Sequence, residues 1–124
     1  MTIDRSRIGT GKKGEEIAAV YLERAGYRIV ERNYRCVFGE IDIVASEGDT
    51  TVFVEVKSRS SDRYGSPQAA VGPEKQRKLS MIALHYLKDK KLLNKNARFD
   101  VVAVMLMPSG PQVELIANAF DLAF

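Results

Sequence analysis

The sequence predicts one α/β domain, in which a mixed β-sheet is flanked by helices in the order α-β-β-β-α-β-β. Three observations support this class. Residues 40–46 and 51–57 alternate between apolar and polar types, which is typical of a β-hairpin. Apolar residues at helical spacing precede and follow that hairpin. Residues 97–107 are largely apolar on both faces, which predicts a central strand covered by helices. Because a helix separates strands 51–57 and 97–107, these strands should pair in parallel through a crossover.

Composition places broad limits on the class of protein. The chain has 124 residues, of which 45% are hydrophobic and 28% charged, as in ordinary globular proteins. Nineteen Lys and Arg residues against 16 Asp and Glu residues give a net charge of +3. This mild surplus favours a polyanionic partner if acidic residues gather around a metal, and otherwise indicates only solubility. A single cysteine, Cys36, excludes an intramolecular disulfide. We expect a cytoplasmic protein without a membrane span.

The first helix is expected over residues 11–25, after a loose arm at residues 1–10, so that residues 11–124 form the domain. Gly26 ends the helix. The helical stripe has Gly14 at its centre, Glu15 at its edge and Glu16 on the opposite side. Glu15 can therefore reach a site beside the sheet, although an acidic residue near a helix start also complements the helix dipole. The apolar members of the stripe are Ile17, Ala18, Tyr21, Leu22 and Ala25.

The hairpin gathers charged residues on one face. A first strand is expected at residues 27–34, and Gly48 then allows the positive φ of a tight turn between the two hairpin strands. A two-residue loop pairs Asp42 with Glu55 and Glu40 with Lys57, all on one face. The other face carries apolar residues, namely Ile41, Ile43, Val52, Val54 and Val56.

Carboxylates held this close on a sheet repel one another by roughly 1 to 4 kcal/mol per pair. A bound cation reverses that effect, and ligands that are all oxygen suit Mg²⁺ or Mn²⁺. Asp42 and Glu55 are therefore predicted metal ligands. Lys57, on the same face, would stabilise a phosphate oxyanion or help to deprotonate water.

These residues resemble a known signature. Asp42 followed by Glu55-Val56-Lys57 is similar to the PD-(D/E)xK motif of the restriction-endonuclease-like nucleases, with Ile41 in the place of the proline. Gly39-Glu40-Ile41-Asp42, the segment 53–59 and Arg98-Phe99-Asp100-Val101 resemble the YraN-type bacterial proteins over most of the chain. The resemblance implies a restriction-endonuclease-like core and a metal-associated carboxylate from the first helix, which selects Glu15. The reaction of the YraN-type family is not settled.

Further contacts are predicted beyond the hairpin. In the loop 58–72, Arg59, Arg63 and Tyr64 are candidates for nucleic-acid binding, although the segment also fits an ordinary solvated crossover. A second helix begins at Gly72-Pro73, and Lys75 and Gln76 on its inward face could approach a phosphate or pack by their stems.

The rest of the second helix and the C-terminal strands are expected to be structural. The helix packs on the sheet through Leu79, Ile82, Ala83, Tyr86, Leu87 and Leu93, and His85 lies off this stripe. Asp100 is assigned a hydrogen-bonding role, because the hairpin and first helix already supply enough carboxylates. A last strand covers residues 112–118, and residues 119–124 pack on the domain or form a subunit contact.

The leading hypothesis is a Mg²⁺-dependent (or Mn²⁺-dependent) nuclease. Lys57, Asp42, Glu55 and Glu15 would be catalytic, with Glu40 and Gln76 accessory. Recognition would rest on backbone charge and shape, with DNA as the expected partner. Branched substrates and a homodimer are implied only by similarity to the archaeal Holliday-junction resolvases. The rival is a non-catalytic nucleic-acid-binding or interaction protein that keeps the fold. A third interpretation treats the acids as surface salt bridges.

Overall fold

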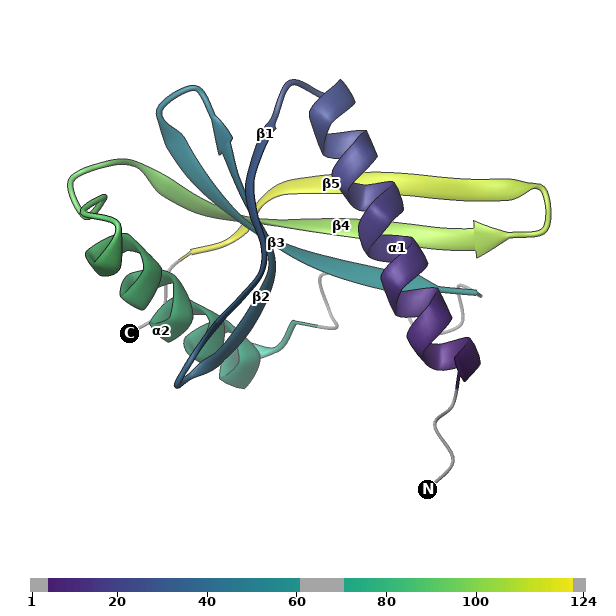
Figure 1. The fold of residues 1–124 in the computed structure, drawn as a ribbon, viewed down its shortest axis with the longest axis horizontal. Helices are drawn as coiled ribbons and strands as arrows, with labels where there is room; N and C mark the ends of the chain where they lie inside the picture. Colours follow the sequence, from purple (N-terminus) through teal and green to yellow (C-terminus); the bar gives the residue numbers. More distant parts are fainter. Residues whose placement is uncertain (1–4, 61–70, 122–124) are drawn as a thin grey trace.

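The fold consists of two helices and a five-stranded sheet, seen in a computed structural model that describes residues 5–60 and 71–121, with side chains from residue 11 onward (Figure 1). The predicted α/β class, mixed sheet and element order are confirmed. Neither helix in these ranges is long and apolar enough to cross a bilayer. The elements in chain order are α1 (Arg5–Arg24), β1 (Arg28–Cys36), β2 (Gly39–Glu47), β3 (Thr50–Arg59), α2 (Pro73–Asp89), β4 (Ala97–Met107) and β5 (Gly110–Phe120).

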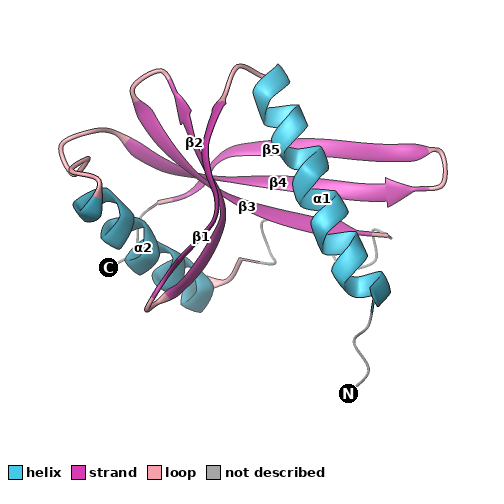
Figure 2. Cartoon of the chain, viewed as in Figure 1, coloured by secondary structure: helices cyan, strands magenta, loops and turns pink. Residues whose placement is uncertain are grey.

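The strands lie in the order β1-β2-β3-β4-β5. Every neighbouring pair is antiparallel except β3 and β4, which run parallel because α2 carries the chain across between them (Figure 2). The predicted crossover is therefore confirmed. The longest predicted strand also has the expected bounds, since β4 covers residues 97–107.

Each helix covers one face of the sheet, and alternate strand residues divide between the two cores. The face toward α1 holds Ala18, Ala19, Leu22, Tyr27, Ile43, Ala45, Val52, Val54, Val102 and Val104. The face toward α2 holds Tyr34, Ile41, Val44, Phe53, Val71, Leu79, Ile82, Ala83, Tyr86, Leu87, Phe99 and Val101. Both faces of β3 and β4 are buried, so these strands form the rigid centre of the sheet. Glu55 and Lys57 lie on β3.

The helices differ from expectation at their ends. Helix α1 begins at Arg5, so it extends into the segment predicted as an arm. Ala25, predicted within the apolar stripe, is exposed because the helix ends at Arg24. Leu93 is 56% exposed, also against prediction, and Leu92 packs on the core in its place. The chain turns beyond Asp89, so helical spacing no longer determines which leucine faces inward.

The hairpin follows the predicted pairing only near its turn. Ile43 pairs with Val54, and the pairing continues to Glu47 and Thr50, with Gly48 at φ 58°. Away from the turn, the ladder between β2 and β3 ends at the Ile43–Val54 pair, so the direct pairings of Asp42 with Glu55 and of Glu40 with Lys57 predicted from the sequence are wrong. Ile41 packs toward α2 instead of sharing the face of Ile43. The physical reason is that β2 continues along β1 while β3 continues along β4, and the two strands separate.

Asp100 has the predicted hydrogen-bonding role. Its side chain is fully buried and accepts hydrogen bonds from the Tyr27 hydroxyl at 2.9 Å, from Arg98 Nε at 3.0 Å and from the backbone N–H of Asn118 at 2.8 Å. These bonds join β4 to β5 and to the residue before β1. Phe120 stacks on Phe99 with 4.6 Å between ring centroids, so this part of the apolar C-terminal segment packs on the domain.

Candidate functional site

A cleft of about 680 Å³ opens where β2 and β3 separate, beside the first turns of α2. It contains acidic residues from the strands and basic residues from the helix. Its lining residues are Glu40, Asp42, Glu55, Glu74, Lys75, Lys78, Leu79 and Ile82. At residues 40–42, β2 keeps β1 as a neighbour on one edge but has lost its pairing with β3 on the other, and the cleft lies at this separation.

Three carboxylates from two elements lie close together, and two of them, Glu40 and Asp42, line the cleft. One oxygen each of Glu15, Glu40 and Asp42 lies within 4.8 Å of the others, and all three residues are half-buried. Glu15 comes from α1, and the other two come from β2. Oxygen atoms at this spacing can all coordinate one hard divalent ion, whose bonds to oxygen are about 2.0–2.6 Å long. Glu40, predicted to be accessory, is thus a full member of the acidic cluster.

Asp42 is held in place by the backbone of the neighbouring strand. Its Oδ2 accepts a hydrogen bond from the backbone N–H of Val56 at 2.8 Å, and so replaces the carbonyl that the interrupted ladder would supply. Burial raises the pKa of the Asp42 carboxyl to about 7, and the charges of Glu55, Glu15 and Glu40 contribute in the same direction. A cation in the cluster would remove this repulsion.

The predicted acid and lysine of β3 also come together. Lys57 Nζ lies 3.4 Å from Glu55 Oε1, and Lys75 Nζ of α2 lies 2.9 Å from the same oxygen. The Glu55 side chain is only 11% exposed. Burial lowers the pKa of Lys57, and the neighbouring ammonium of Lys75 lowers it further. Burial also acts to lower the pKa of Lys75, but its bond to Glu55 and the Glu55 charge outweigh that effect and raise it.

The structure adds two arginines that sequence reasoning missed. Arg35 Nε donates to Glu40 Oε2 at 2.7 Å. Arg32 lies 4.0 Å from Glu15 Oε2 and bonds the exposed Glu16 at 2.6 Å. The signal for Arg35 was present, because a two-residue turn at Val37 and Phe38 places it opposite Glu40, as the ladder shows. Both arginines come from β1, which pairs with the acidic strand β2.

The remaining predicted residues have different placements. Gln76 Nε2 donates to the Val71 carbonyl at 2.8 Å, which ties the start of α2 to the preceding segment. Arg59 ends β3, two residues beyond Lys57. Arg63 and Tyr64 lie outside the described residues. His85 is bonded through Nδ1 to the Tyr34 hydroxyl at 2.8 Å, on the outer side of α2.

Comparison with known proteins identifies close relatives. The family described as "Uncharacterised protein family UPF0102" matches residues 14–104. The UPF0102 protein of Syntrophus aciditrophicus is 66% identical, and the match covers 94% of this chain and 92% of that protein. The UPF0102 protein of Geobacter sulfurreducens is 56% identical, and the match covers 92% of this chain and 90% of that protein. The UPF0102 protein of Moorella thermoacetica is 48% identical, and the match covers 97% of this chain and 100% of that protein.

Among solved structures, the chain is similar to one described as the structure of Pyrococcus furiosus SfsA in complex with Ca²⁺. The two are 17% identical with a TM-score of 0.37, and the match covers 90% of this chain and 63% of that chain.

Proposed function

Because the chain belongs to the uncharacterised protein family UPF0102, whose name carries no activity, we propose a function from the geometry of the cleft. The protein is a metal-dependent nuclease that hydrolyses phosphodiester bonds and recognises the shape and charge of nucleic acid rather than its sequence. DNA is the first candidate substrate. The homodimer and branched substrates of the resolvases belong to this proposal by similarity alone.

The observation that carries the proposal is the meeting of acids and a partly buried lysine where two strands separate. Asp42 receives a hydrogen bond from the β3 backbone at 2.8 Å, and Lys57 lies on the same strand 3.4 Å from Glu55. Burial and the acidic neighbours raise the pKa of the Asp42 carboxyl to about 7, which means that its charged form destabilises the sheet. This cost is typical of a site prepared for a cation.

The residues have separate roles in the proposed reaction. Asp42, Glu15 and Glu40 would hold the ion, and Glu55 would join them when it releases its lysines. A bound Mg²⁺ or Mn²⁺ would activate water and stabilise charge on the phosphoryl oxygens. Lys57, whose side chain is 21% exposed, would face the scissile phosphate and stabilise the negative charge that develops in the transition state.

Basic residues on α2 would hold the nucleic-acid backbone. Lys75 and Lys78 line the cleft beside the acids, and Arg59 lies at the end of β3. Contacts of this kind bind phosphates without reading bases, which supports recognition by charge and shape. Lys75 therefore keeps its predicted role at the nucleic acid, although in this structure its ammonium bonds Glu55.

The test is a cleavage assay on single-stranded, duplex and branched DNA and on RNA, with Mg²⁺, Mn²⁺ or EDTA. We expect metal-dependent cleavage that Lys57→Met reduces by about 100-fold or more, since an electrostatic group acting in the transition state is worth that much. Methionine keeps the apolar stem, and circular dichroism melting confirms that the variant folds. Lys88→Met, on the exposed far end of α2, is the matched control and should cleave normally.

The rival function is nucleic-acid binding without cleavage. One observation favours it, because Glu55 forms ion pairs with Lys57 and Lys75, which would compete with a metal for its carboxylate. Calorimetric titration with Mn²⁺ separates the two functions. Heat of binding that Asp42→Asn abolishes supports the nuclease. Nucleic-acid binding with neither Mn²⁺ binding nor cleavage of any substrate would establish the rival.

A further inference from the structure

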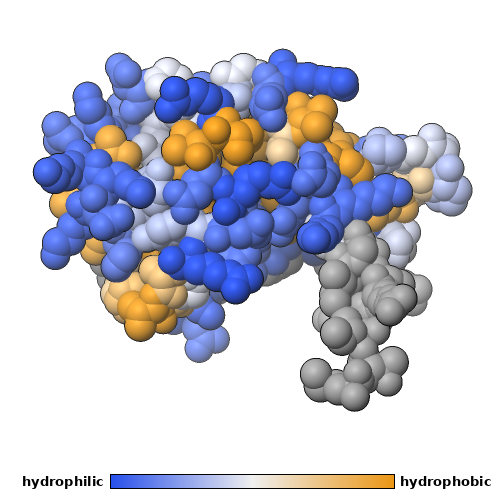
Figure 3. Space-filling model, viewed as in Figure 1, coloured by the Kyte–Doolittle hydropathy of each residue, from blue (hydrophilic) through white to orange (hydrophobic). Residues whose placement is uncertain are grey.

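An apolar surface lies beside the acidic cleft. The turn between β1 and β2 presents Val37, which is 87% exposed, and Phe38, which is 40% exposed. Met81 and Leu84 on α2 are also exposed. Figure 3 shows apolar surface at the lower left, over this turn. We call Val37 and Phe38 the apolar tip. Large apolar side chains at the end of a turn between charged strands contribute little to a core and instead indicate a binding role.

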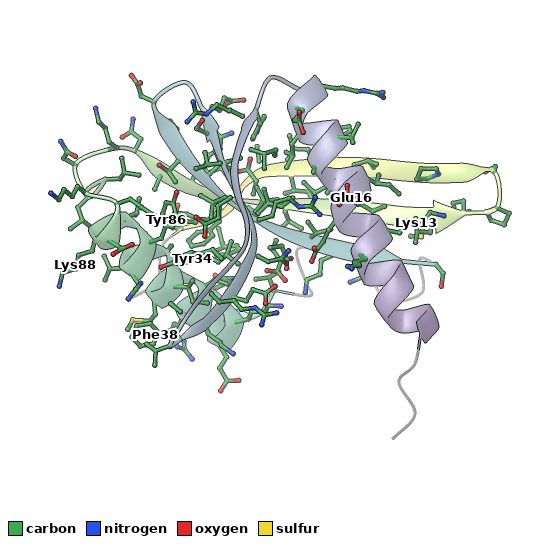
Figure 4. The ribbon with its side chains drawn as sticks, viewed as in Figure 1. Lys13, Glu16, Tyr34, Phe38, Tyr86 and Lys88 are labelled. Atoms are coloured by element: carbon green, nitrogen blue, oxygen red, sulfur yellow. The ribbon has the colours of Figure 1, made fainter. Side chains whose placement is uncertain are left out.

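The apolar tip is supported from below. The Phe38 ring meets the His85 ring nearly edge-on, with 6.3 Å between their centroids. His85 is fixed by its hydrogen bond to the Tyr34 hydroxyl at 2.8 Å, and the Tyr34 ring packs edge-on against Tyr86 in the core. Phe38, Tyr34 and Tyr86, which are labelled in Figure 4, follow one another from the turn toward the sheet. The aromatic ring at the tip is therefore a positioned platform.

The tip is joined directly to the cleft through Gly39. This residue has φ +137°, and a Cβ there would lie 2.9 Å from Lys78 Cε and 3.2 Å from Ile82 Cδ1. Lys78 and Ile82 both line the cleft. The turn therefore packs against one wall of the cleft, and the next residue after Gly39 is Glu40 of the acidic cluster.

Cations lie at the start of α2 and beside the turn that carries the apolar tip. Helix α2 carries Lys75, Arg77 and Lys78 in its first two turns, against Glu74 alone. Arg35, 78% exposed, stands on β1 just before the turn. A ligand that matches this surface has negative charge along the helix and a flat apolar group at its end, which is the chemistry of a nucleotide strand with an unstacked base.

We propose that Phe38 and Val37 stack an unpaired nucleobase of the substrate, while the cations of α2 hold the adjoining phosphates. The inference rests on the proposed nuclease function and names its substrate class, namely single strands, bulges and branch points. In a continuous duplex each base is already stacked on both sides, so it offers no face to the Phe38 ring. A second copy of the chain fits less well. Three of the four apolar residues are 40% exposed or less, whereas a stable interface buries about 800 Å² per partner.

The test compares two labelled DNA duplexes that differ only by a central bulge of unpaired thymines. Affinities are measured by fluorescence anisotropy in EDTA, so that neither metal chemistry nor cleavage enters the result. The native protein should prefer the bulged duplex, and Phe38→Ala should weaken binding to it by about tenfold with little effect on the paired duplex. Phe38→Tyr, which keeps the ring, should bind like the native protein. Leu93→Ala is the matched control, because Leu93 is an exposed apolar residue outside the apolar tip.

Three results would overturn the inference. They are equal affinity for both duplexes, unchanged bulge binding by Phe38→Ala, and a Phe38→Ala effect limited to self-association in sedimentation, which would assign the face to a second copy. The nuclease proposal fails separately. If Phe38-dependent bulge binding occurs but no substrate is cleaved with Mg²⁺ or Mn²⁺, then the apolar tip stands and the hydrolase assignment does not.

Discussion

Two aspartates of this chain occupy opposite kinds of environment. Asp100 is fully buried, but Tyr27 and Arg98 donate hydrogen bonds to it, and Arg98 also supplies the opposite charge. Asp42 receives one backbone hydrogen bond from Val56, and the charges of Glu55, Glu15 and Glu40 act together with burial to raise its pKa. A charge that is fully satisfied stabilises a fold, whereas one surrounded by like charge destabilises it until a cation binds. At the scale of the residue, this contrast separates the structural acid, Asp100, from Asp42, the acid that we propose binds a metal.

Asp42→Asn should remove a pH-dependent loss of stability. Burial raises the pKa of this carboxyl from its ordinary value of 3.8, which applies to the unfolded chain, to about 7 in the folded protein. Between these values the folded protein binds a proton that the unfolded chain has lost, so stability is full at low pH and falls as the pH rises to 7. We expect the native protein to lose about 2–4 kcal/mol relative to Asp42→Asn between pH 4 and pH 8, as measured by urea unfolding in EDTA.

The amide keeps an acceptor for the Val56 N–H, so this comparison isolates the charge. Asp49→Asn, in the exposed β2–β3 turn, is the control and should follow the native pH profile. Parallel stability curves for the native protein and Asp42→Asn would mean that the carboxylate is not destabilised in the fold.

At the scale of the elements, the approach of α1 to β3 determines where Glu15 lies. Gly14 is buried, and a Cβ at this position would overlap the side chain of Ser58. The helix can lie this close to the strand only because residue 14 has no side chain. Glu15, the next residue, is thereby brought to within 4.8 Å of oxygens of Glu40 and Asp42.

Gly14→Ala should destabilise the domain by about 1–3 kcal/mol despite the better helix propensity of alanine, because the helix must move away from β3. Thermal unfolding measures the effect. Ser58→Gly added to Gly14→Ala should restore most of the loss, since it removes the overlapping atoms. Gly11→Ala, in the same helix with open space around it, should instead stabilise by about 0.5–1 kcal/mol. Equal stability of the two alanine variants would rule out the close approach.

At the scale of the whole molecule, the candidate site is assembled from four elements. Helix α1 supplies Glu15, β2 supplies Asp42, β3 supplies Glu55 and Lys57, and α2 supplies Lys75. The parallel crossover carries the start of α2 to the point where β2 and β3 separate. Because these elements pack on both faces of the sheet, a ligand that joins their side chains would stabilise the folded state as a whole.

Mn²⁺ should therefore raise the melting temperature by several degrees. Saturation at 100 times the dissociation constant adds about 2.7 kcal/mol of stability. EDTA should reverse the shift, and Asp42→Asn should lose most of it, whereas Asp49→Asn should respond as the native protein does. Differential scanning fluorimetry across a Mn²⁺ titration provides the measurement. An unchanged melting temperature up to millimolar Mn²⁺ would count against the metal site.

The sequence by itself determined the fold class, the element order and the turn at Gly48, because alternation and helical spacing are local properties of the chain. It also singled out Asp42, Glu55 and Lys75, which line the cleft. Only the tertiary structure decided that β2 leaves β3 after Ile43, that Ile41 packs toward α2, and that Arg35 and Lys75 neutralise the acids. The physical reason is that, beyond Ile43, β2 stays paired with β1 and β3 stays paired with β4, and no pattern within one strand reveals where two paired strands separate.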